Sequence, residues 1–263
     1  MEGYGAHTYG DRFADVYDDW YGDVTDVAAC TRRLADLADA AGGGAVLELG
    51  VGSGRLALPL AERGLDVHGI DASAAMLERL RSKPGSAALH LTQGDMAELA
   101  LPDAPPFAVV FVAFNTFFNL GTAPEQARCL RQVAERLAPD GVFVLEAFVP
   151  AAASDVPTGG AVTPRQITAD EVVLTVSHHD GPGQTITGQH IHVTEGGIRL
   201  RPWHLRYAAP AELDTMAEEA GLQLLWRHAD WTGRAFGPDA SVHVSGYGRG
   251  NVRDVQPPGS AAP

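Results

Sequence analysis

The hydrophobic positions of this chain change their period several times, and each change predicts an element. Between five short apolar runs, apolar residues recur at helical spacing, with glycine or proline at the ends of these stretches. The runs are too short for buried helices and have the length of strands: 45–49, 66–71, 88–92, 107–113 and 142–148. Strand and helix thus alternate through the first 150 residues. The pattern predicts an α/β fold, in which a parallel sheet carries helices on both faces.

After this region the pattern becomes one of strands alone. Stretches rich in Val, Ile and Thr, separated by glycine-rich turns, predict an antiparallel insertion at 166–177, 185–194 and 198–207. The α/β pattern then resumes with a helix from Pro210 and two closing strands. We therefore expect an N-terminal region at 1–43, with helices at 11–20 and 24–41, and a core at 44–150 and 209–249. Between the two parts of the core, residues 151–208 are expected to form a linker (151–164) followed by the insertion. Residues 250–263 are expected to be a disordered tail.

The first strand runs into three closely spaced glycines, Gly50, Gly52 and Gly54. Glycines let a backbone approach a ligand closely, and the following helix offers unpaired N–H groups. The dinucleotide fingerprint would require a third glycine where Arg55 stands. Glu48, two residues before the loop, suits a cationic amino-acid group better than a pyrophosphate. The stretch VLELGVGSGR resembles motif I of the class I S-adenosylmethionine (SAM)-dependent methyltransferases.

Acidic residues follow the next two strands. Asp71 ends the second strand, where a carboxylate can accept both ribose hydroxyls; Ser73 is the better helix cap, which leaves Asp71 for a ligand. Asp95 and the Met96 N–H, after the third strand, match the edge of an adenine. Taken singly, each signal is equally explained by a helix cap or a turn. Three of them at successive strand ends favour a SAM site.

The resemblance covers about residues 9–150 and 209–249. It implies a Rossmann-like sheet of seven strands, with an antiparallel β insertion after the fifth. The aromatic segment 9–21 looks like the N-terminal lid of small-molecule methyltransferases, although its periodicity is equally that of an amphipathic helix with core aromatics. The resemblance implies these cofactor contacts: Tyr9, Tyr17, Tyr21, Glu48, Gly50, Gly52, Ser53, Gly54, Asp71, Ala72, Met76, Asp95, Met96, Ala113, Phe114 and Asn115.

The segment 114–120, after the fourth strand, lies where related methyltransferases place residues around the transferable methyl group. The alternative is a helix start capped by Asn115. The chain is similar to actinobacterial natural-product enzymes, including sugar N,N-dimethyltransferases, but has Asn119 where the sugar enzymes have a histidine. The expected catalytic residues are Tyr17, Asn119 and His178, with His179 and His204 as alternative bases. The expected substrate contacts are Tyr9, Phe118, Asn119, Glu146, Trp203, Arg206 and Trp231.

Composition narrows the range of partners. The 263 residues carry a formal charge of −14, which argues against a general nucleic-acid surface. Two cysteines form no disulfide framework, no apolar run approaches a membrane span, and we expect a cytoplasmic protein. His190 and His192 share a strand face at metal-compatible spacing, but no cysteine or carboxylate completes a motif, so no metal is expected.

The expected function is therefore SAM-dependent methyl transfer to an N or O acceptor of a small molecule, in a single SN2 step and in secondary metabolism. Alternatives are an RNA or protein methyltransferase, a non-catalytic protein that binds SAM or S-adenosylhomocysteine, and, more remotely, an NAD oxidoreductase. The insertion is expected to cover the substrate pocket, with a dimerisation surface or a stabilising flap as alternatives. A homodimer remains open.

Overall fold

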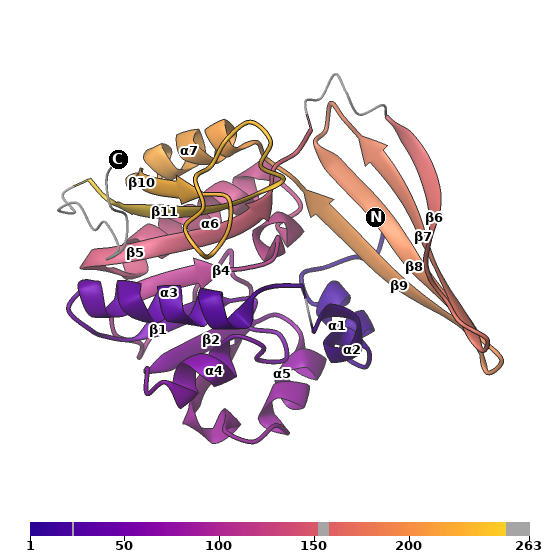
Figure 1. The fold of residues 1–263 in the computed structure, drawn as a ribbon, viewed down its shortest axis with the longest axis horizontal. Coiled ribbons are helices and arrows are strands. Elements are labelled where there is room, and N and C mark those ends of the chain that lie inside the picture. The colour runs from indigo at the N-terminus through magenta and orange to yellow at the C-terminus, as the bar shows by residue number, and fades with distance from the viewer. Residues whose placement is uncertain (23, 152–157, 251–263) are drawn as a thin grey trace.

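The computed structural model describes residues 1–22, 24–151 and 158–250, which form two sheets (Figure 1). The larger sheet has the order β10-β11-β5-β4-β1-β2-β3, and its first five strands in sequence are parallel. Strand β11 is antiparallel to both of its neighbours. The strands are β1 (Val46–Leu49), β2 (Val67–Asp71), β3 (Leu89–Gln93), β4 (Phe107–Val112), β5 (Leu137–Phe148), β10 (Leu222–His228) and β11 (Val242–Arg249). The α/β class and the seven-stranded sheet are confirmed.

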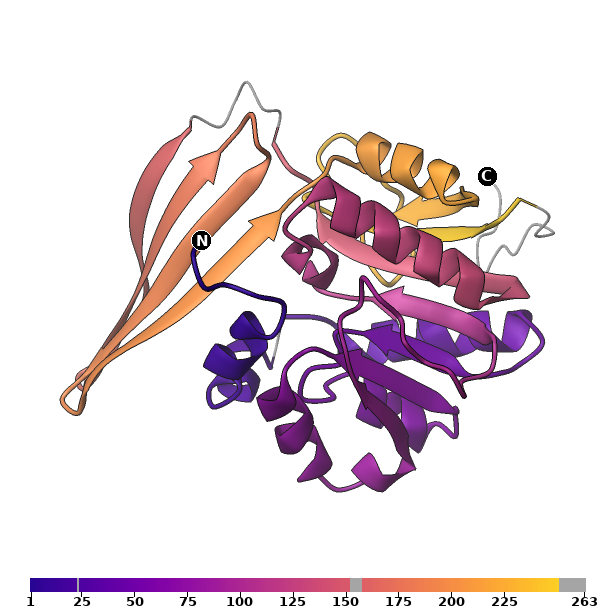
Figure 2. The ribbon, with the colours of Figure 1, turned by 180° about the vertical axis from the view of Figure 1, so that it is seen from behind.

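Helices cover both faces of this sheet (Figures 1 and 2). Buried side chains of α3, α4 and α5 form one apolar layer with the sheet, and those of α6 and α7 form the other. Every residue of β4 is buried, as expected for a parallel strand covered on both sides. The helices are α3 (Val27–Ala40), α4 (Ala57–Glu62), α5 (Ala74–Arg81), α6 (Ala123–Arg136) and α7 (Pro210–Glu219), with short 3-10 turns η1 (Ser86–Ala88) and η2 (Thr116–Asn119).

The insertion forms a separate antiparallel sheet of four strands: β6 (Gly159–Ile167), β7 (Glu171–Asp180), β8 (Thr185–Thr194) and β9 (Gly197–Arg206). The prediction of three strands was wrong here. The stretch 166–177 is divided by a turn, in which the Thr168 hydroxyl accepts a hydrogen bond from the Glu171 N–H at 3.2 Å. Part of the expected linker, residues 159–164, pairs with β7 as the first half of strand β6.

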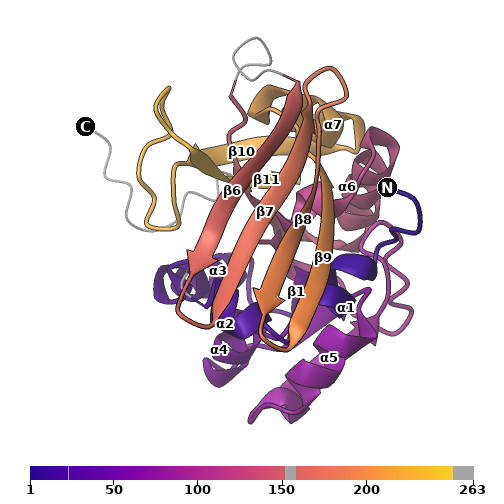
Figure 3. The same ribbon diagram turned by 90° about the vertical axis from the view of Figure 1, so that its right-hand side faces the viewer.

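The N-terminal segment lies between the two sheets, as Figure 3 shows from the side of the insertion. It forms two short helices, α1 (Thr8–Phe13) and α2 (Tyr17–Tyr21), instead of the single helix expected over 11–20. The turn between them lets aromatic residues of both helices contact one another: Phe13 packs against Tyr9 at 4.3 Å and against Tyr21 at 6.4 Å between ring centroids. We call residues 8–21 the lid.

The start of the first long helix differs from the prediction. Helix α3 begins at Val27 instead of residue 24, because the Asp26 carboxylate caps it by accepting from the Ala29 N–H at 2.9 Å. Residues 251–263 of the expected disordered tail lie outside the described residues. Within the described part of the chain, no helix is long and apolar enough to cross a membrane.

Candidate functional site

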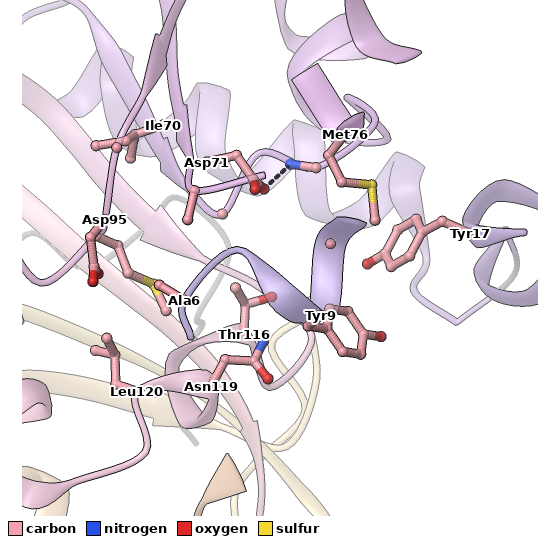
Figure 4. A pocket seen from close by; sticks show the side chains of 16 residues that line it. Ala6, Tyr9, Tyr17, Ile70, Asp71, Met76, Asp95, Thr116, Asn119 and Leu120 are labelled. Carbon is pink, nitrogen blue, oxygen red and sulfur yellow. Dashed lines mark hydrogen bonds between the residues drawn. The ribbon is translucent and has the colours of Figure 1, made fainter. Parts of the chain in front are cut away.

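A cavity lies at the carboxyl ends of β1, β2 and β3, beneath the lid (Figure 4). Its empty volume is about 650 Å³ including the open mouth, which is in the range of small-molecule sites. The sheet contributes Gly50, Gly52, Ile70, Asp71, Ala72, Gly94, Asp95 and Met96; α5 contributes Met76; the lid and the segment before it contribute Ala6, Tyr9, Gly10 and Tyr17; and the turn after β4 contributes Thr116, Asn119 and Leu120.

The three glycines of the loop have different tasks. All have positive φ angles, of 69°, 54° and 84°. A Cβ on Gly50 would lie 2.4 Å from Thr116 Cγ2, and one on Gly54 would lie 2.2 Å from Leu80 Cδ1, so these two glycines permit close packing. Gly54 does not line the cavity. Gly52 has no side chain within 4 Å of its Cβ position and exposes its backbone to the cavity, where a ligand can approach it.

Asp71 is held in place by the backbone around it. Its Oδ2 accepts from the Gly52 N–H and its Oδ1 from the Ser73 N–H, both at 2.8 Å. Ser73 caps α5 as expected, but Asp71 also binds protein groups, because its carboxylate accepts these two backbone hydrogen bonds. Burial raises the pKa of Asp71, and the two backbone hydrogen bonds oppose this rise. Each carboxylate oxygen keeps a lone pair, so the side chain can still accept two ribose hydroxyls.

Asp95 lies at the other end of the cavity from Tyr17 (Figure 4). Its Oδ1 accepts from the Ala97 N–H at 2.8 Å, which fixes the carboxylate beside Met96. This end of the cavity therefore offers a carboxylate and an apolar wall for a base. The arrangement fits an adenine with its amino group toward Asp95.

A second, smaller hollow adjoins the first and shares Tyr17, Gly50, Gly52 and Thr116 with it. It is further lined by Glu48, Val51, Ser53, Arg55 and Ala113. Burial raises the pKa of Glu48 to about 8, although the charge of Arg55 acts in the opposite direction.

Buried polar atoms in this smaller hollow lack a protein partner. Glu48 Oε2 is one of them, and Arg55 Nε and Nη1 are two more. Unsatisfied buried groups are costly, and a ligand that carries both an ammonium and a carboxylate would satisfy both side chains. The hollow thus fits the amino-acid end of the expected cofactor. The sequence indicated Glu48 but not Arg55.

The lid closes the cavity with tyrosines whose hydroxyls stay protonated. Burial raises the pKa of Tyr17 to about 12 and raises the pKa of Tyr9 as well. Tyr9 and Tyr17 line the cavity, whereas Tyr21 packs behind Tyr17 at 5.1 Å between ring centroids. Neutral tyrosines can donate hydrogen bonds to a ligand without acting as bases near neutral pH.

The sequence did not reveal how the lid is attached. Asp18 accepts from Ser53 Oγ at 2.5 Å and from Arg79 Nε at 2.7 Å, and it pairs with Lys83 Nζ at 2.9 Å. These three partners lower the pKa of Asp18 to about 2 against the opposing effect of burial. Ser53, expected to contact the cofactor, thus also anchors α2.

Hydrogen bonds with residues of β5 hold the turn after β4 in place. Phe114 and Asn115 have φ angles of 49° and 61°, and the Phe114 N–H donates to Glu146 Oε2 at 2.8 Å. Asn115 Oδ1 accepts from the Phe148 N–H at 2.6 Å, and its side chain makes no cap hydrogen bond to η2. The alternative of Asn115 as a helix cap is therefore wrong. Glu146, Phe114 and Asn115 do not line the cavity and instead support Thr116 and Asn119, which do.

Several expected site residues lie away from the cavity. Phe118 is fully buried against Phe148, and Trp231 is buried in the layer of α3. Arg206 binds Gln126, Gln184 and the Glu212 carboxylate, in a network that joins β9 to α6 and α7. Neither the type of a residue nor its position in the sequence shows whether partners elsewhere in the chain already surround or satisfy its side chain.

The insertion histidines are likewise dispersed. His178 is exposed on β7, while His179 contacts the Tyr207 hydroxyl at 2.7 Å, and His204 contacts Thr187 Oγ1 at 2.8 Å. None of them lines the cavity described above. Trp203 packs beside His190 in the interface between the insertion and the lid, with their ring centroids 6.0 Å apart.

His190 and His192, which have metal-compatible spacing, already contact polar side chains of the insertion. His190 Nδ1 contacts Thr175 Oγ1 at 2.9 Å, and His192 Nε2 lies 2.6 Å from Glu171 Oε2. Elsewhere in the described chain, Asp66, His68 and His90 have potential ligand atoms within 4.8 Å of one another. This group precedes or begins β2 and β3, and so lies at the opposite end of the strands from the cavity.

Comparison with known proteins agrees with this geometry. Residues 46–141 match the family model described as a methyltransferase domain. The structure of the CcbJ methyltransferase from Streptomyces caelestis is 42% identical, with a TM-score of 0.84 over 94% of this chain and 99% of that one. The cypemycin N-terminal methyltransferase of Streptomyces sp is 29% identical over 196 residues, which are 74% of this chain and 78% of that protein.

A more distant structure shares the fold. SAM-bound CalS10, an amino pentose methyltransferase from Micromonospora echinaspora, is 22% identical, with a TM-score of 0.57 over 93% of this chain and 92% of that one. The strand order, the glycine loop and the acidic residues after β2 and β3 are thus found in a chain with methyltransferase relatives along almost its whole length. The chain therefore belongs to the class I SAM-dependent methyltransferases, and SAM is its cofactor.

Proposed function

We propose that this protein methylates an amine nitrogen of a small natural product in a single SN2 step. The observation that carries the proposal is the chemistry of the cavity wall. Among the described residues that line the cavity, none is a histidine or a lysine, and we assign its two carboxylates, Asp71 and Asp95, to the cofactor. An amine acceptor needs only a neutral, oriented lone pair, whereas a hydroxyl acceptor needs a base to remove its proton.

We assign the cofactor contacts from the two hollows. Glu48 and Arg55 would bind the ammonium and carboxylate of the amino-acid part, Asp71 the ribose hydroxyls, and Asp95 with the Met96 N–H the adenine. SAM supplies a methyl group on a positively charged sulfur. The protein's part in catalysis is then to align the acceptor with that methyl group and to exclude water.

The acceptor would enter between the lid and η2. Tyr9, Tyr17 and Asn119 line that part of the cavity (Figure 4), and their side chains offer neutral donors and acceptors that can orient an amine. The insertion, within 151–208, would cover this side, the lid helices within 1–43 would close it, and the core would be 44–150 with 209–249.

The relatives support an amine acceptor of this kind. The cypemycin enzyme is named for methylation at an N terminus, which is an amine. The proposed reaction is therefore a step of natural-product biosynthesis.

The test is transfer of labelled methyl from SAM into a metabolite extract of the source organism, with Asp71→Ala as the inactive control. Label in a small molecule, on a nitrogen by mass spectrometric fragmentation, is the expected result. Label on an oxygen would reject the amine acceptor. Label in RNA or protein would reject the small-molecule class. Tight SAM binding without transfer to any fraction would favour a non-catalytic binding protein.

A further inference from the structure

Three side chains that can bind a metal ion meet at the amino ends of β2 and β3. Asp66 directly precedes β2, His68 is the second residue of β2, and His90 is the second residue of β3. One potential ligand atom of each residue lies within 4.8 Å of those of the other two. Asp71 lies at the other end of β2, so this group is separate from the cofactor cavity.

The pairing of the two strands brings the histidines together. His68 and His90 are partners in the parallel ladder, and such partners lie on the same face of a sheet. Their rings are stacked, with centroids 4.5 Å apart and planes 22° apart. The His68 ring also packs edge-on against the fully buried Phe107 at 5.2 Å, and its side chain is 13% exposed. One ring is therefore held in place, whereas the His90 side chain, 64% exposed, can adjust to an ion.

The distances to the carboxylate are those between two ligands of one metal ion. Asp66 Oδ1 lies 3.6 Å from His68 Nε2 and 3.2 Å from His90 Nε2. A tetrahedral zinc ion binds nitrogen and carboxylate oxygen at about 2.0–2.2 Å, which places any two of its ligands about 3.3–3.6 Å apart. The backbone of Asp66 is fixed, because its carbonyl accepts from the Val46 N–H at 2.8 Å. Small movements of the side chains would thus complete a site.

The alternative is an ion pair between the carboxylate and a protonated histidine. One protonated ring would be enough for that pair, and like charges at paired positions of neighbouring strands destabilise a sheet. Two stacked rings that both turn Nε2 toward one carboxylate oxygen are better suited to holding a cation between them than to being two cations themselves. The arrangement therefore favours a metal ion.

We propose that Asp66, His68 and His90 bind a divalent transition-metal ion of the zinc type. Two imidazole nitrogens and one carboxylate oxygen are ligands that zinc accepts, whereas Mg²⁺ and Ca²⁺ prefer oxygen ligands alone. Three protein ligands leave one tetrahedral position for water. The bound ion would join β3, which is the edge strand of the larger sheet, to β2. Its role would be structural, since the cofactor cavity lies at the other end of these strands.

The test is calorimetric titration of the metal-free, ligand-free protein with Zn²⁺ near pH 7.5, where a free imidazole is mostly neutral. The variants are His90→Ala and Asp66→Asn, which each remove one ligand at a solvent-exposed side chain. The matched control is His178→Ala, which removes an exposed strand histidine outside the group. S-adenosylhomocysteine binding, measured without zinc, would verify that each variant is folded.

We expect the wild type and His178→Ala to bind one Zn²⁺ per chain with micromolar affinity, and to unfold at a higher temperature when zinc is present. Loss of a residue that merely orients a metal ligand costs about 10–100-fold in affinity, so the loss of His90 or of the Asp66 carboxylate should cost at least about tenfold. Both variants should also lose the thermal shift.

Three results would overturn the proposal. The first is a wild type that binds no zinc at about 100 μM of the free ion. The second is equal affinity in His90→Ala or Asp66→Asn, because the ion would then lie elsewhere. The third is Mg²⁺ binding as tightly as Zn²⁺, which would exclude the nitrogen ligands. None of these results depends on which molecule is methylated.

Discussion

Replacing Glu48 with glutamine should remove a pH dependence from cofactor binding. Burial raises the pKa of Glu48 to about 8 in the free protein, so its carboxyl group is protonated near pH 6.5. An ammonium bound beside it favours the carboxylate, so binding should release the proton. With a pKa of 8, the ionised fraction rises from about 1% at pH 6 to about 9% at pH 7, and the Kd should fall about ninefold over this interval.

Titration calorimetry with S-adenosylhomocysteine measures this directly, because the product has the same amino-acid and nucleoside groups and no methyl group to transfer. The heats are compared at pH 6.5 in two buffers with different ionisation enthalpies. We expect about one proton released for each molecule bound by the wild type. Between pH 6 and 7 the ligand's own α-amino group, with a pKa of about 7.7–8.0, stays largely protonated.

The Glu48→Gln variant keeps the shape of the side chain but cannot ionise. It should bind more weakly, with a Kd that does not vary over this range and with no proton release. Glu98→Gln removes an exposed carboxylate outside the cavity and should behave as the wild type does. A wild-type Kd that is constant from pH 6 to 7, or the same slope in Glu48→Gln, would refute this account of Glu48.

Three further predictions follow from the same geometry. Glu48→Gln should raise the free energy of unfolding of the ligand-free protein at pH 7 by up to about 3 kcal/mol, measured in denaturant. The raised pKa of Glu48 means that the wild type loses stability as the pH rises from about 4.5 to 8, and glutamine does not ionise. An unchanged free energy of unfolding would contradict the cost of burying the Glu48 carboxylate. Gly52→Ala should weaken S-adenosylhomocysteine binding at least about tenfold by calorimetry, whereas Gly42→Ala, also at positive φ but away from the cavity, should leave the Kd unchanged. Asn119→Ala should lower kcat/KM for the acceptor about tenfold in a methyl-transfer assay and leave S-adenosylhomocysteine affinity intact; equal losses in both would place Asn119 at the cofactor instead.

The part of the cavity wall at the edge of the sheet could be predicted from the sequence, because these residues lie at the ends of strands. Glycine spacing, Asp71 and Asp95 each follow a strand that hydrophobicity alone reveals, and parallel strands bring their carboxyl ends to one edge. The same reasoning indicated Glu48 within the first strand. Arg55 could not be predicted as a site residue, because its side chain comes to line the same hollow as Glu48 only once the glycine loop has folded.

The acceptor side could not be predicted in the same way, because its residues are selected by contacts between distant segments. Arg206 has the chemistry of a ligand contact, yet Gln126 and Glu212 from other elements already bind it. The Val, Ile and Thr content of 166–207 and its glycine-rich turns predicted strands. It could not show that the polar face would be the covered one, because the segment that covers it comes from the first 21 residues.

The ion pair between Asp15 of the lid and Arg201 of the insertion joins segments that are 186 residues apart in sequence. Arg201 is 3% exposed, and its hydrogen bonds are the principal cause of a lowered pKa at Asp15. In the proposed function the lid closes over the cofactor and the insertion covers the acceptor, and this ion pair holds the two segments together, so binding of one ligand would affect binding of the other. Whatever factor the acceptor adds to the affinity for the cofactor, the cofactor must add to the affinity for the acceptor.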